Sequence, residues 1–263
     1  MKTLFITGSH IRHIYLVKKF SNFFKDFRWI VEKREININH NKLKKNKIYL
    51  KHINDFKKQE KYFFKNCKNF IKQKKNKLVY IKRNKTNLSN FNKLILREVE
   101  QHKPKVIFSY GCRKINVSLI KKRGLKCFNI HGGLLPKYRG VNTNFWPHIN
   151  NESNLVGITM HDLSDKIDSG NIFFQESGDI QSKDTINTLS CKVIKNFCDT
   201  KINKIYYLLT KKFTSKGIKF KTSHRVWKKK DFHPRYIKFA TQNFEKFKIT
   251  RDNKNKYKLI NIF

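Results

Sequence analysis

The sequence predicts an α/β fold built on a doubly wound, mostly parallel sheet. Residues 3–7 form a short run with an apolar centre, which is typical of a buried strand. Gly8 and Ser9 supply a turn, and the apolar residues of 11–20 then recur at the spacing of an amphipathic helix. A strand, a glycine turn and a helix in this order open a doubly wound α/β fold. Strand-like and helix-like segments also alternate along much of the remaining chain.

The later elements follow from the same two periodicities. Apolar runs of strand length stand at 27–31, 78–81, 106–111, 126–130, 155–160 and 172–176. Helical spacing of apolar residues covers 91–102, 117–122, 142–151 and 184–209. Asp184 is the candidate N-cap of the last of these helices, and Pro104 marks the end of the first.

Two regions depart from this alternation. Residues 34–76 are rich in lysine and asparagine and carry a helical apolar pattern, which predicts one or two surface helices in an insertion. Residues after 210 are basic and aromatic, without regular strand spacing. We therefore expect a main domain over 1–210, with the insertion inside it, and a basic C-terminal extension over 211–263.

Length and composition limit the class of protein. A chain of 263 residues suits one large domain or one domain with an appendage, and it can bury a substantial core. The first apolar run is too short for a signal peptide, and no segment approaches the length that crosses a membrane. The five cysteines, at 67, 112, 127, 191 and 198, have the spacing of neither a zinc site nor a disulfide framework. We expect a cytoplasmic protein without a membrane or a metal partner.

The net charge of +42 has two interpretations. A charge of this size can indicate a nucleic-acid partner. However, Ala240 is the only alanine in the chain, and the lysines are scattered rather than gathered on one motif. Lysine, asparagine, isoleucine and phenylalanine have A/T-rich codons, so genome composition explains much of the charge. We expect most lysines to form solvated surface with a weak attraction for phosphorylated molecules.

The run FNIHGGLLPKYRG over 128–140 is the most informative stretch of the chain. It ends an apolar strand and opens a glycine-rich turn, with Asn129 and His131 two residues apart. Side chains two apart on a strand share a face, so the amide and the imidazole should point into one pocket. Asp168 follows far downstream in the loop KIDSGNI. An amide donor, a base and a carboxylate suit acyl transfer, because they can hold an oxyanion and move a proton.

The two motifs resemble those of the folate-dependent formyltransferases. They read Asn-x-His-x-x-Leu-Leu-Pro-x-Tyr-Arg-Gly and, about forty residues later, Asp-x-Gly-x-Ile. The resemblance runs from about 105 to 176 and includes the strand over 156–161. It departs at Gly132 and Gly133, where many relatives carry a Pro-Ser pair. It implies a Rossmann-like fold with residues 1–210 as the catalytic domain, closest in layout to the sugar N-formyltransferases.

The resemblance also implies roles for individual residues. As catalytic residues, Asn129 would hold the developing oxyanion, His131 would relay the proton of the attacking amine, and Asp168 would support proton removal. The residues expected at the formyl donor, 10-formyltetrahydrofolate, are Arg113, Ile115, Leu135, Pro136 and His161. Around the first two, main-chain groups would read the pterin. The residues expected at the acceptor are Gly8, Ser9, His10, Tyr138 and Arg139. No metal is needed.

The acceptor is predicted by elimination. Purine-pathway relatives carry a Gly-x-Gly-Ser-Asn-type phosphate loop, whereas this chain has Thr-Gly-Ser-His at 7–10. Methionyl-tRNA relatives carry a C-terminal β-barrel of roughly a hundred residues, the size of a small domain. Here about fifty residues follow the last long helix. A primary amine of a nucleotide-linked amino sugar is the first choice, with glycinamide ribonucleotide and methionyl-tRNA as alternatives. The alternative of another class is a nucleic-acid-binding protein on this scaffold, and a homodimer is left open.

Overall fold

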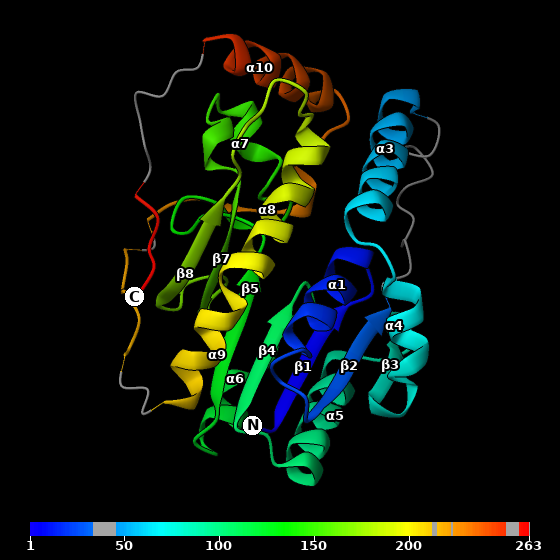
Figure 1. Cartoon of the computed structure of the whole chain (residues 1–263), viewed down its shortest axis with the longest axis vertical. Coiled ribbons are helices and arrows are strands. Elements are labelled where there is room, and N and C mark those ends of the chain that lie inside the picture. Colours follow the sequence, from blue (N-terminus) through cyan, green and yellow to red (C-terminus); the bar gives the residue numbers. More distant parts are fainter. Residues whose placement is uncertain (34–45, 212–214, 222, 251–257, 263) are drawn as a thin grey trace.

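The computed structural model of the chain describes residues 1–33, 46–211, 215–221, 223–250 and 258–262 (Figure 1). Within them the main sheet contains β1 (Thr3–Gly8), β2 (Phe27–Lys33), β3 (Leu78–Lys82), β4 (Val106–Tyr110), β5 (Lys126–His131), β7 (Gly157–Asp162) and β8 (Ile172–Ser177). Their order is β3-β2-β1-β4-β5-β7-β8. The strands from β3 to β5 in this order are parallel, whereas β7 is antiparallel to β5 and β8. The predicted doubly wound, mostly parallel α/β fold is confirmed.

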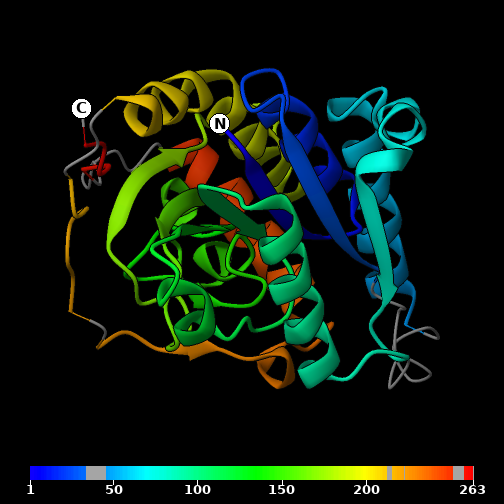
Figure 2. The ribbon, with the colours of Figure 1, turned by 90° about the horizontal axis from the view of Figure 1, so that it is seen from below.

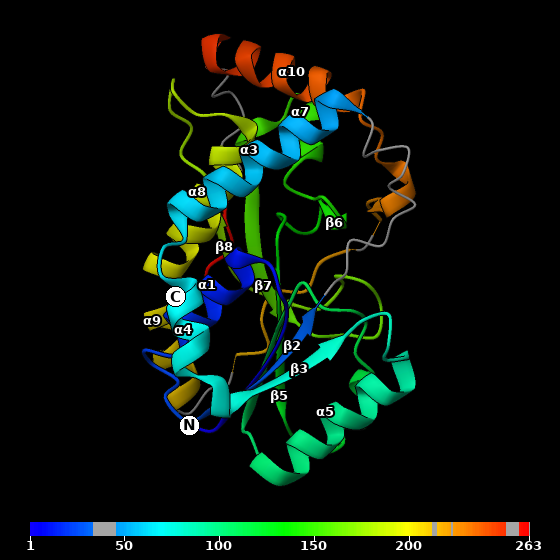
Figure 3. The ribbon, with the colours of Figure 1, turned by 90° about the vertical axis from the view of Figure 1, so that its right-hand side faces the viewer.

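Helices cover both faces of the sheet. In the described part of the chain they are α1 (Ile11–Phe20), α3 (Lys47–Phe63), α4 (Cys67–Gln73), α5 (Leu88–His102), α6 (Val117–Lys121), α7 (Trp146–Ile149), α8 (Ile186–Thr200), α9 (Ile202–Thr210) and α10 (Tyr236–Thr250). The 3-10 turns are η1 (Lys75–Lys77), η2 (Ser153–Leu155) and η3 (Lys229–Asp231). Figure 3 shows the sheet between α5 on one side and α1, α4, α8 and α9 on the other.

The pleat of the strands divides the core in two. Phe5, Phe108 and Phe128 point to the face of α1 and α8 and belong to a large aromatic-rich core. Leu4 and Ile107, each one residue away on the same strands, point to the face of α5 and belong to a smaller aliphatic core. All six residues of β1 are buried, because a parallel strand is covered by helices on both faces.

The residues after 210 pack against the same core. Ala240 and Phe244 of α10 are fully buried in the aromatic-rich core. A two-residue strand, β9 (Val226–Trp227), pairs in parallel with β6 (Arg139–Gly140). Figure 2 shows the orange segment before α10 running along the outside of the green strands. The domain boundary near 210 therefore stays a prediction from composition, since packing continues across it.

The insertion expected over 34–76 is described only in part. Residues 34–45 lie outside the described residues. Residues 46–76 contain α3, α4 and the first part of η1, which agrees with the one or two helices predicted there. The amphipathic helix α3 packs against α8 and contributes the buried Glu60, which accepts a hydrogen bond from Arg12 at 2.6 Å.

Two expected helices differ in detail. The helix expected over 142–151 is reduced to the single turn of α7, because Asn142 and Asn151 both adopt a left-handed backbone with φ of 55°. The helix expected over 184–209 is divided into α8 and α9 at Lys201. Its N-cap is Thr185, which forms a capping box with Thr188. Asp184, the predicted cap, instead accepts from the Gln181 N–H and pairs with Lys192.

Candidate active site

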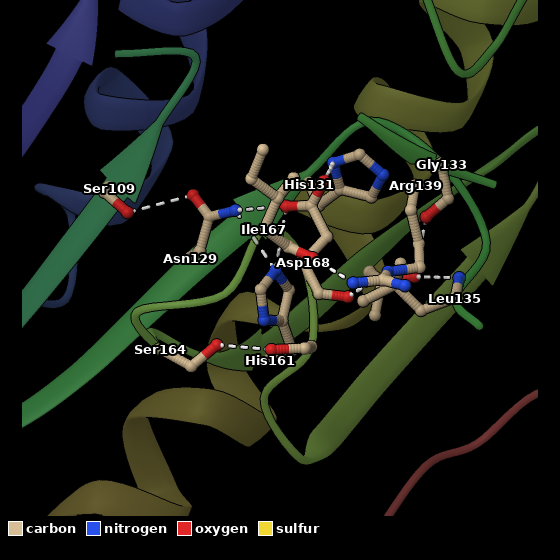
Figure 4. Close-up of polar contacts among 12 residues, drawn as sticks. Ser109, Asn129, His131, Gly133, Leu135, Arg139, His161, Ser164, Ile167 and Asp168 are labelled. Atoms are coloured by element: carbon tan, nitrogen blue, oxygen red, sulfur yellow. Dashed lines mark hydrogen bonds and ion pairs between the residues drawn. The ribbon is translucent and has the colours of Figure 1, made fainter. Parts of the chain in front are cut away.

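Two neighbouring strands bring three polar side chains together at the carboxyl end of β5. Asn129 and His131 lie two apart on β5, and the antiparallel strand β7 places His161 directly opposite Asn129. The parallel neighbour β4 places Ser109 beside Asn129 on its other side. Strand registers therefore position this group, which makes it more rigid than a site built from loops. Asp168 joins it from the loop between β7 and β8 (Figure 4).

The Asp168 carboxylate lies close to Asn129, His131 and His161. Its Oδ1 lies 3.4 Å from Asn129 Nδ2 and 3.6 Å from His161 Nε2. Its Oδ2 lies 3.5 Å from His131 Nδ1 and accepts a hydrogen bond from the Gly140 N–H at 2.8 Å. Only 10% of the side chain is exposed. The structure thus places Asn129 and His131 beside the carboxylate of Asp168, so the three predicted catalytic residues lie together.

A hydrogen bond from β4 orients the side chain of Asn129. The Ser109 hydroxyl donates to Asn129 Oδ1 at 2.9 Å. The amide NH₂ consequently faces His161 and Asp168, with His161 Nε2 at 3.1 Å. An amide nitrogen can only donate, so β4 and β5 together direct a pair of N–H groups into the site.

The two histidines present different ring atoms to the site. His131 Nε2 lies 2.7 Å from the Tyr138 carbonyl, which can only accept, so this nitrogen carries the hydrogen. The other nitrogen, Nδ1, faces Asp168 and is the atom of neutral His131 that can accept a proton. His161 Nδ1 donates to the Asp162 carbonyl at 2.7 Å, so its Nε2 accepts from the Asn129 amide.

Burial and neighbouring charges act differently on the pKa values of His131 and Asp168. Burial lowers the pKa of His131 below its usual value, and the attraction of Asp168 offsets only part of this effect. Burial alone would raise the pKa of Asp168, but His131, His161 and the Gly140 N–H outweigh it and hold that pKa below its usual range. At neutral pH the site therefore contains a neutral imidazole beside an ionised carboxylate, which can stabilise an imidazolium once it forms.

The glycine-leucine loop after β5 is held by two residues that sequence reasoning missed. The Thr159 hydroxyl donates to the Gly133 carbonyl at 2.7 Å and accepts from the Leu135 N–H at 3.2 Å. Gln175 Nε2 donates to the Leu135 carbonyl at 2.7 Å. Thr159 lies two residues before His161 on β7, and Gln175 lies opposite it on β8. The sequence signal that could have found Thr159 is its spacing of two residues from His161 along β7.

The residues predicted to bind the formyl donor lie in different environments. The Arg113 N–H and guanidinium both donate to the buried carboxylate of Glu32, so this main-chain donor is already engaged. Ile115 is 3% exposed and belongs to the aliphatic core. Leu135 is buried and Pro136 is partly exposed in the loop after β5, and His161 belongs to the polar group described above. Glu32 was missed because its partner is distant in sequence.

The residues predicted at the acceptor are divided as well. Gly8 ends β1, and Ser9 and His10 follow it. This strand is two strands from β5 and thus roughly 10 Å away. A side chain on Gly8 would meet the Gly111 carbonyl and the His13 ring, each at 2.7 Å, so glycine is required there.

Tyr138 and Arg139 form hydrogen bonds with protein groups beside the site. Tyr138 is 1% exposed, and its hydroxyl donates to Glu152. Arg139 is 5% exposed, and its Nε donates to the Asp168 main-chain carbonyl at 3.0 Å. Both side chains are thus engaged with the protein.

Two further findings concern the described residues as a group. Among them, no three His, Cys, Asp or Glu side chains are arranged so that they could hold a metal ion. Within the same ranges, every helix is too short or too polar to span a bilayer.

Residues 36–198, more than half of the chain, match the sequence model of the family described as formyl transferase. This chain belongs to the formyl transferase family. The resemblance carried by the motifs over 105–176 is thereby confirmed.

Curated relatives of known name match part of the chain. The bifunctional polymyxin resistance protein ArnA of Wigglesworthia glossinidia brevipalpis is 40% identical over 144 residues, which is 54% of this chain and 21% of that protein. The methionyl-tRNA formyltransferase of Buchnera aphidicola subsp. Acyrthosiphon pisum (strain Tuc7) is 38% identical over 89 residues, 34% of this chain and 28% of that protein. The chain therefore spans less than a third of the length of either relative.

Solved structures of this family share the fold. A sugar N-formyltransferase from Shewanella sp. superposes with a TM-score of 0.56 at 20% identity, covering 88% of this chain and 78% of the other. A phosphoribosylglycinamide formyltransferase from Bacillus halodurans superposes with a TM-score of 0.53 at 14% identity, covering 80% and 96%. At these identities the likeness shows the fold alone.

Proposed function

We propose that this chain transfers a formyl group from 10-formyltetrahydrofolate to a primary amine. The observation that carries the proposal is that Asn129, His131 and Asp168 lie together at the carboxyl end of β5. Membership of the formyl transferase family supports the reaction class. A sugar 3N-formyl transferase was crystallised in the presence of dTDP and 5-N-formyl-THF, and it shares this fold with a TM-score of 0.54 at 18% identity.

The donor set of the site fits a formyl group. The Asn129 N–H that faces Asp168 in a long contact of 3.4 Å would turn to a carbonyl oxygen of the donor. Removal of one such donor typically costs about 3 kcal/mol of transition-state stabilisation. His131 Nδ1 offers a lone pair to the proton of an attacking amine. When bound, the folate would supply an activated formyl carbon and a nitrogen leaving group.

Proton transfer would be handled by the histidine and the carboxylate. His131 accepts the proton of the amine at Nδ1 while Nε2 stays bonded to the Tyr138 carbonyl. Asp168, 3.5 Å away, stabilises the resulting imidazolium. The same proton can then be returned to the leaving nitrogen, so the site ends the cycle in its starting protonation state.

For the acceptor we propose the amine of a nucleotide-linked amino sugar. The support is the sequence Thr-Gly-Ser-His at 7–10, which differs from the phosphate loop expected of purine-pathway relatives, together with the sugar formyltransferases among the structures that share the fold. The scattered lysines would add a general attraction for a phosphorylated substrate.

The test is an incubation of the full chain with 10-formyltetrahydrofolate and a panel of amines. The panel contains amino-sugar nucleotides, glycinamide ribonucleotide and methionyl-tRNA, and mass spectrometry identifies the product that gains one formyl group. A formylated amino-sugar nucleotide is expected. A formylated product only with one of the other two acceptors contradicts the sugar assignment, and no product with any amine contradicts the activity itself.

A further inference from the structure

The Asp168 carboxylate is held by β6 as well as by the histidines. The Gly140 N–H donates to Asp168 Oδ2 at 2.8 Å. Arg139 binds the main chain of the loop that carries Asp168. Its Nε donates to the Asp168 carbonyl, and its Nη2 donates to the Ile167 carbonyl (Figure 4). Asp168 itself has a left-handed backbone, with φ of 44°. Its position therefore depends on where β6 lies.

β6 is in turn fixed by residues 224–227, which we call the strap. Arg139 pairs with Val226, and Gly140 pairs with Trp227, in the parallel ladder of β6 and β9. The Trp227 carbonyl accepts from the Val141 N–H at 3.0 Å, and the His224 carbonyl accepts from Arg139 Nη1 at 3.4 Å. Main-chain groups of the strap thus contact both residues that hold Asp168.

One aromatic stack fastens the strap to the body of the protein. The rings of Trp227 and Trp146 lie 4.1 Å apart at 11°. Trp146 is 2% exposed, and its indole N–H donates to the Val141 carbonyl at 3.0 Å. The Arg225 guanidinium lies 4.3 Å from the centroid of the Trp227 ring. Stacked aromatic pairs contribute beyond their buried area, so Trp227 is the side chain that keeps the strap in this register.

The fit between the strap and β6 is close. Gly140 has a φ of 98°, a conformation that favours glycine. A Cβ at this position would lie 2.1 Å from the Trp227 carbonyl oxygen. The strap and β6 can approach this closely only because residue 140 lacks a side chain.

We propose that the strap is a positioning element of the active site, and that the stack of Trp227 on Trp146 keeps Asp168 in place through β6. The strap lies beyond residues 36–198, the part that matches the family model. The effect on formyl transfer rests on the proposed function, whereas the effect on the position of Asp168 does not.

The kinetic test compares three variants of the full chain. Trp227→Ala should lower kcat by about tenfold to a hundredfold, because a displaced catalytic group reacts poorly. The KM for the formyl donor should stay within about twofold, because none of the residues predicted at the donor lies in the strap. Trp227→Phe keeps a ring that can stack and should stay within about threefold of the wild-type kcat. Phe239→Ala removes a half-exposed ring of α10 and should behave as wild type.

A second measurement needs no activity. The charged and titratable groups that face His131 are Asp168, His161 and Arg139. Of these, the Asp168 carboxylate raises the pKa of His131, so a displaced Asp168 should lower it. NMR titration of the imidazole should show the His131 pKa in Trp227→Ala shifted toward its value in Asp168→Asn, with the Phe239→Ala value unchanged.

The outcomes separate the two proposals. If the wild type transfers no formyl group but the His131 titration shifts as expected, the strap proposal stands and the proposed function fails. A Trp227→Ala protein that is folded, with wild-type kcat and an unshifted His131 pKa, overturns the strap proposal. Should this variant not fold, Trp227→Leu keeps apolar volume without a stacking face, and the same two results decide the question.

Discussion

Two buried carboxylates at the same end of the sheet have opposite kinds of partner. Glu32, at the end of β2, is fully buried and accepts from both the N–H and the guanidinium of Arg113, with Arg83 at 3.8 Å. Asp168 is 10% exposed, and its partners are His131, His161 and neutral donors. Both carboxylates satisfy the requirement that a buried charge be paired.

The difference lies in whether the partners can change charge. Arginine stays protonated under all ordinary conditions, so the partners of Glu32 keep their charge and hold it in place. Histidine titrates near neutral pH, so the group around Asp168 can take up and release a proton. The partners, and not burial or residue type, separate a structural carboxylate from a chemical one. Four predictions test this comparison.

The largest effect is expected for Asp168→Asn. Asparagine tolerates the left-handed backbone at this position and removes only the charge, so kcat should fall by about a thousandfold while the fold is kept. Steady-state kinetics and thermal unfolding measure the two effects. Asp165→Asn makes the same change at an exposed position of the same loop and should be silent. An Asp168→Asn enzyme within tenfold of wild type contradicts the assigned role.

Glu32→Gln should act on stability instead. Removing one partner of a buried ion pair costs about 3 kcal/mol, because the Arg113 guanidinium is left without its counter-charge. Urea unfolding measures the loss, and kcat in the folded enzyme should change far less than in Asp168→Asn. Glu100→Gln, at an exposed ion pair with Arg123, should cost less than about 1 kcal/mol. Equal stability losses in these two variants would mean that Glu32 is not a structural carboxylate.

His148 is a third buried group, and no carboxylate in the described part of the chain forms an ion pair with it. His148 donates or accepts through Nδ1 at Ser153, and burial lowers its pKa to about 3. Between pH 6.5, the usual value, and pH 3, the unfolded chain binds a proton that the folded chain does not. The free energy of unfolding should therefore fall with decreasing pH, by about 1.4 kcal/mol per unit from this group. In His148→Gln the slope should be reduced by that amount, and an unchanged slope refutes the assignment.

The smallest effect concerns the pH dependence of catalysis. Because burial lowers the pKa of His131, the acid limb of kcat/KM should lie below pH 6.5 in the wild type. Asp168 raises that pKa, so its removal in Asp168→Asn should move the acid limb of the residual activity to lower pH. A limb that moves to higher pH would show that His131 is not the titrating group.

Much of the fold and part of the site could be predicted from local patterns. Strand-like runs and helical spacing located the sheet, since each periodicity reports which side of a segment is buried. The two-residue spacing of Asn129 and His131 predicted that they share a face, and both lie beside the same carboxylate. Thr159 and Gln175 escaped notice because only the register of β7 with β8 shows that they hold the loop after β5.

The sequence by itself determined the alternation of strands and helices, the family motif and the placement of an amide and an imidazole on one strand, because all of these depend on neighbours along the chain. Which group pairs with each charged side chain depends on the tertiary structure. Arg113 reaches Glu32 across 81 positions, and Arg139 reaches the strap across 85. Such pairs form when packing brings distant segments together, and local periodicity contains no information about distance between segments.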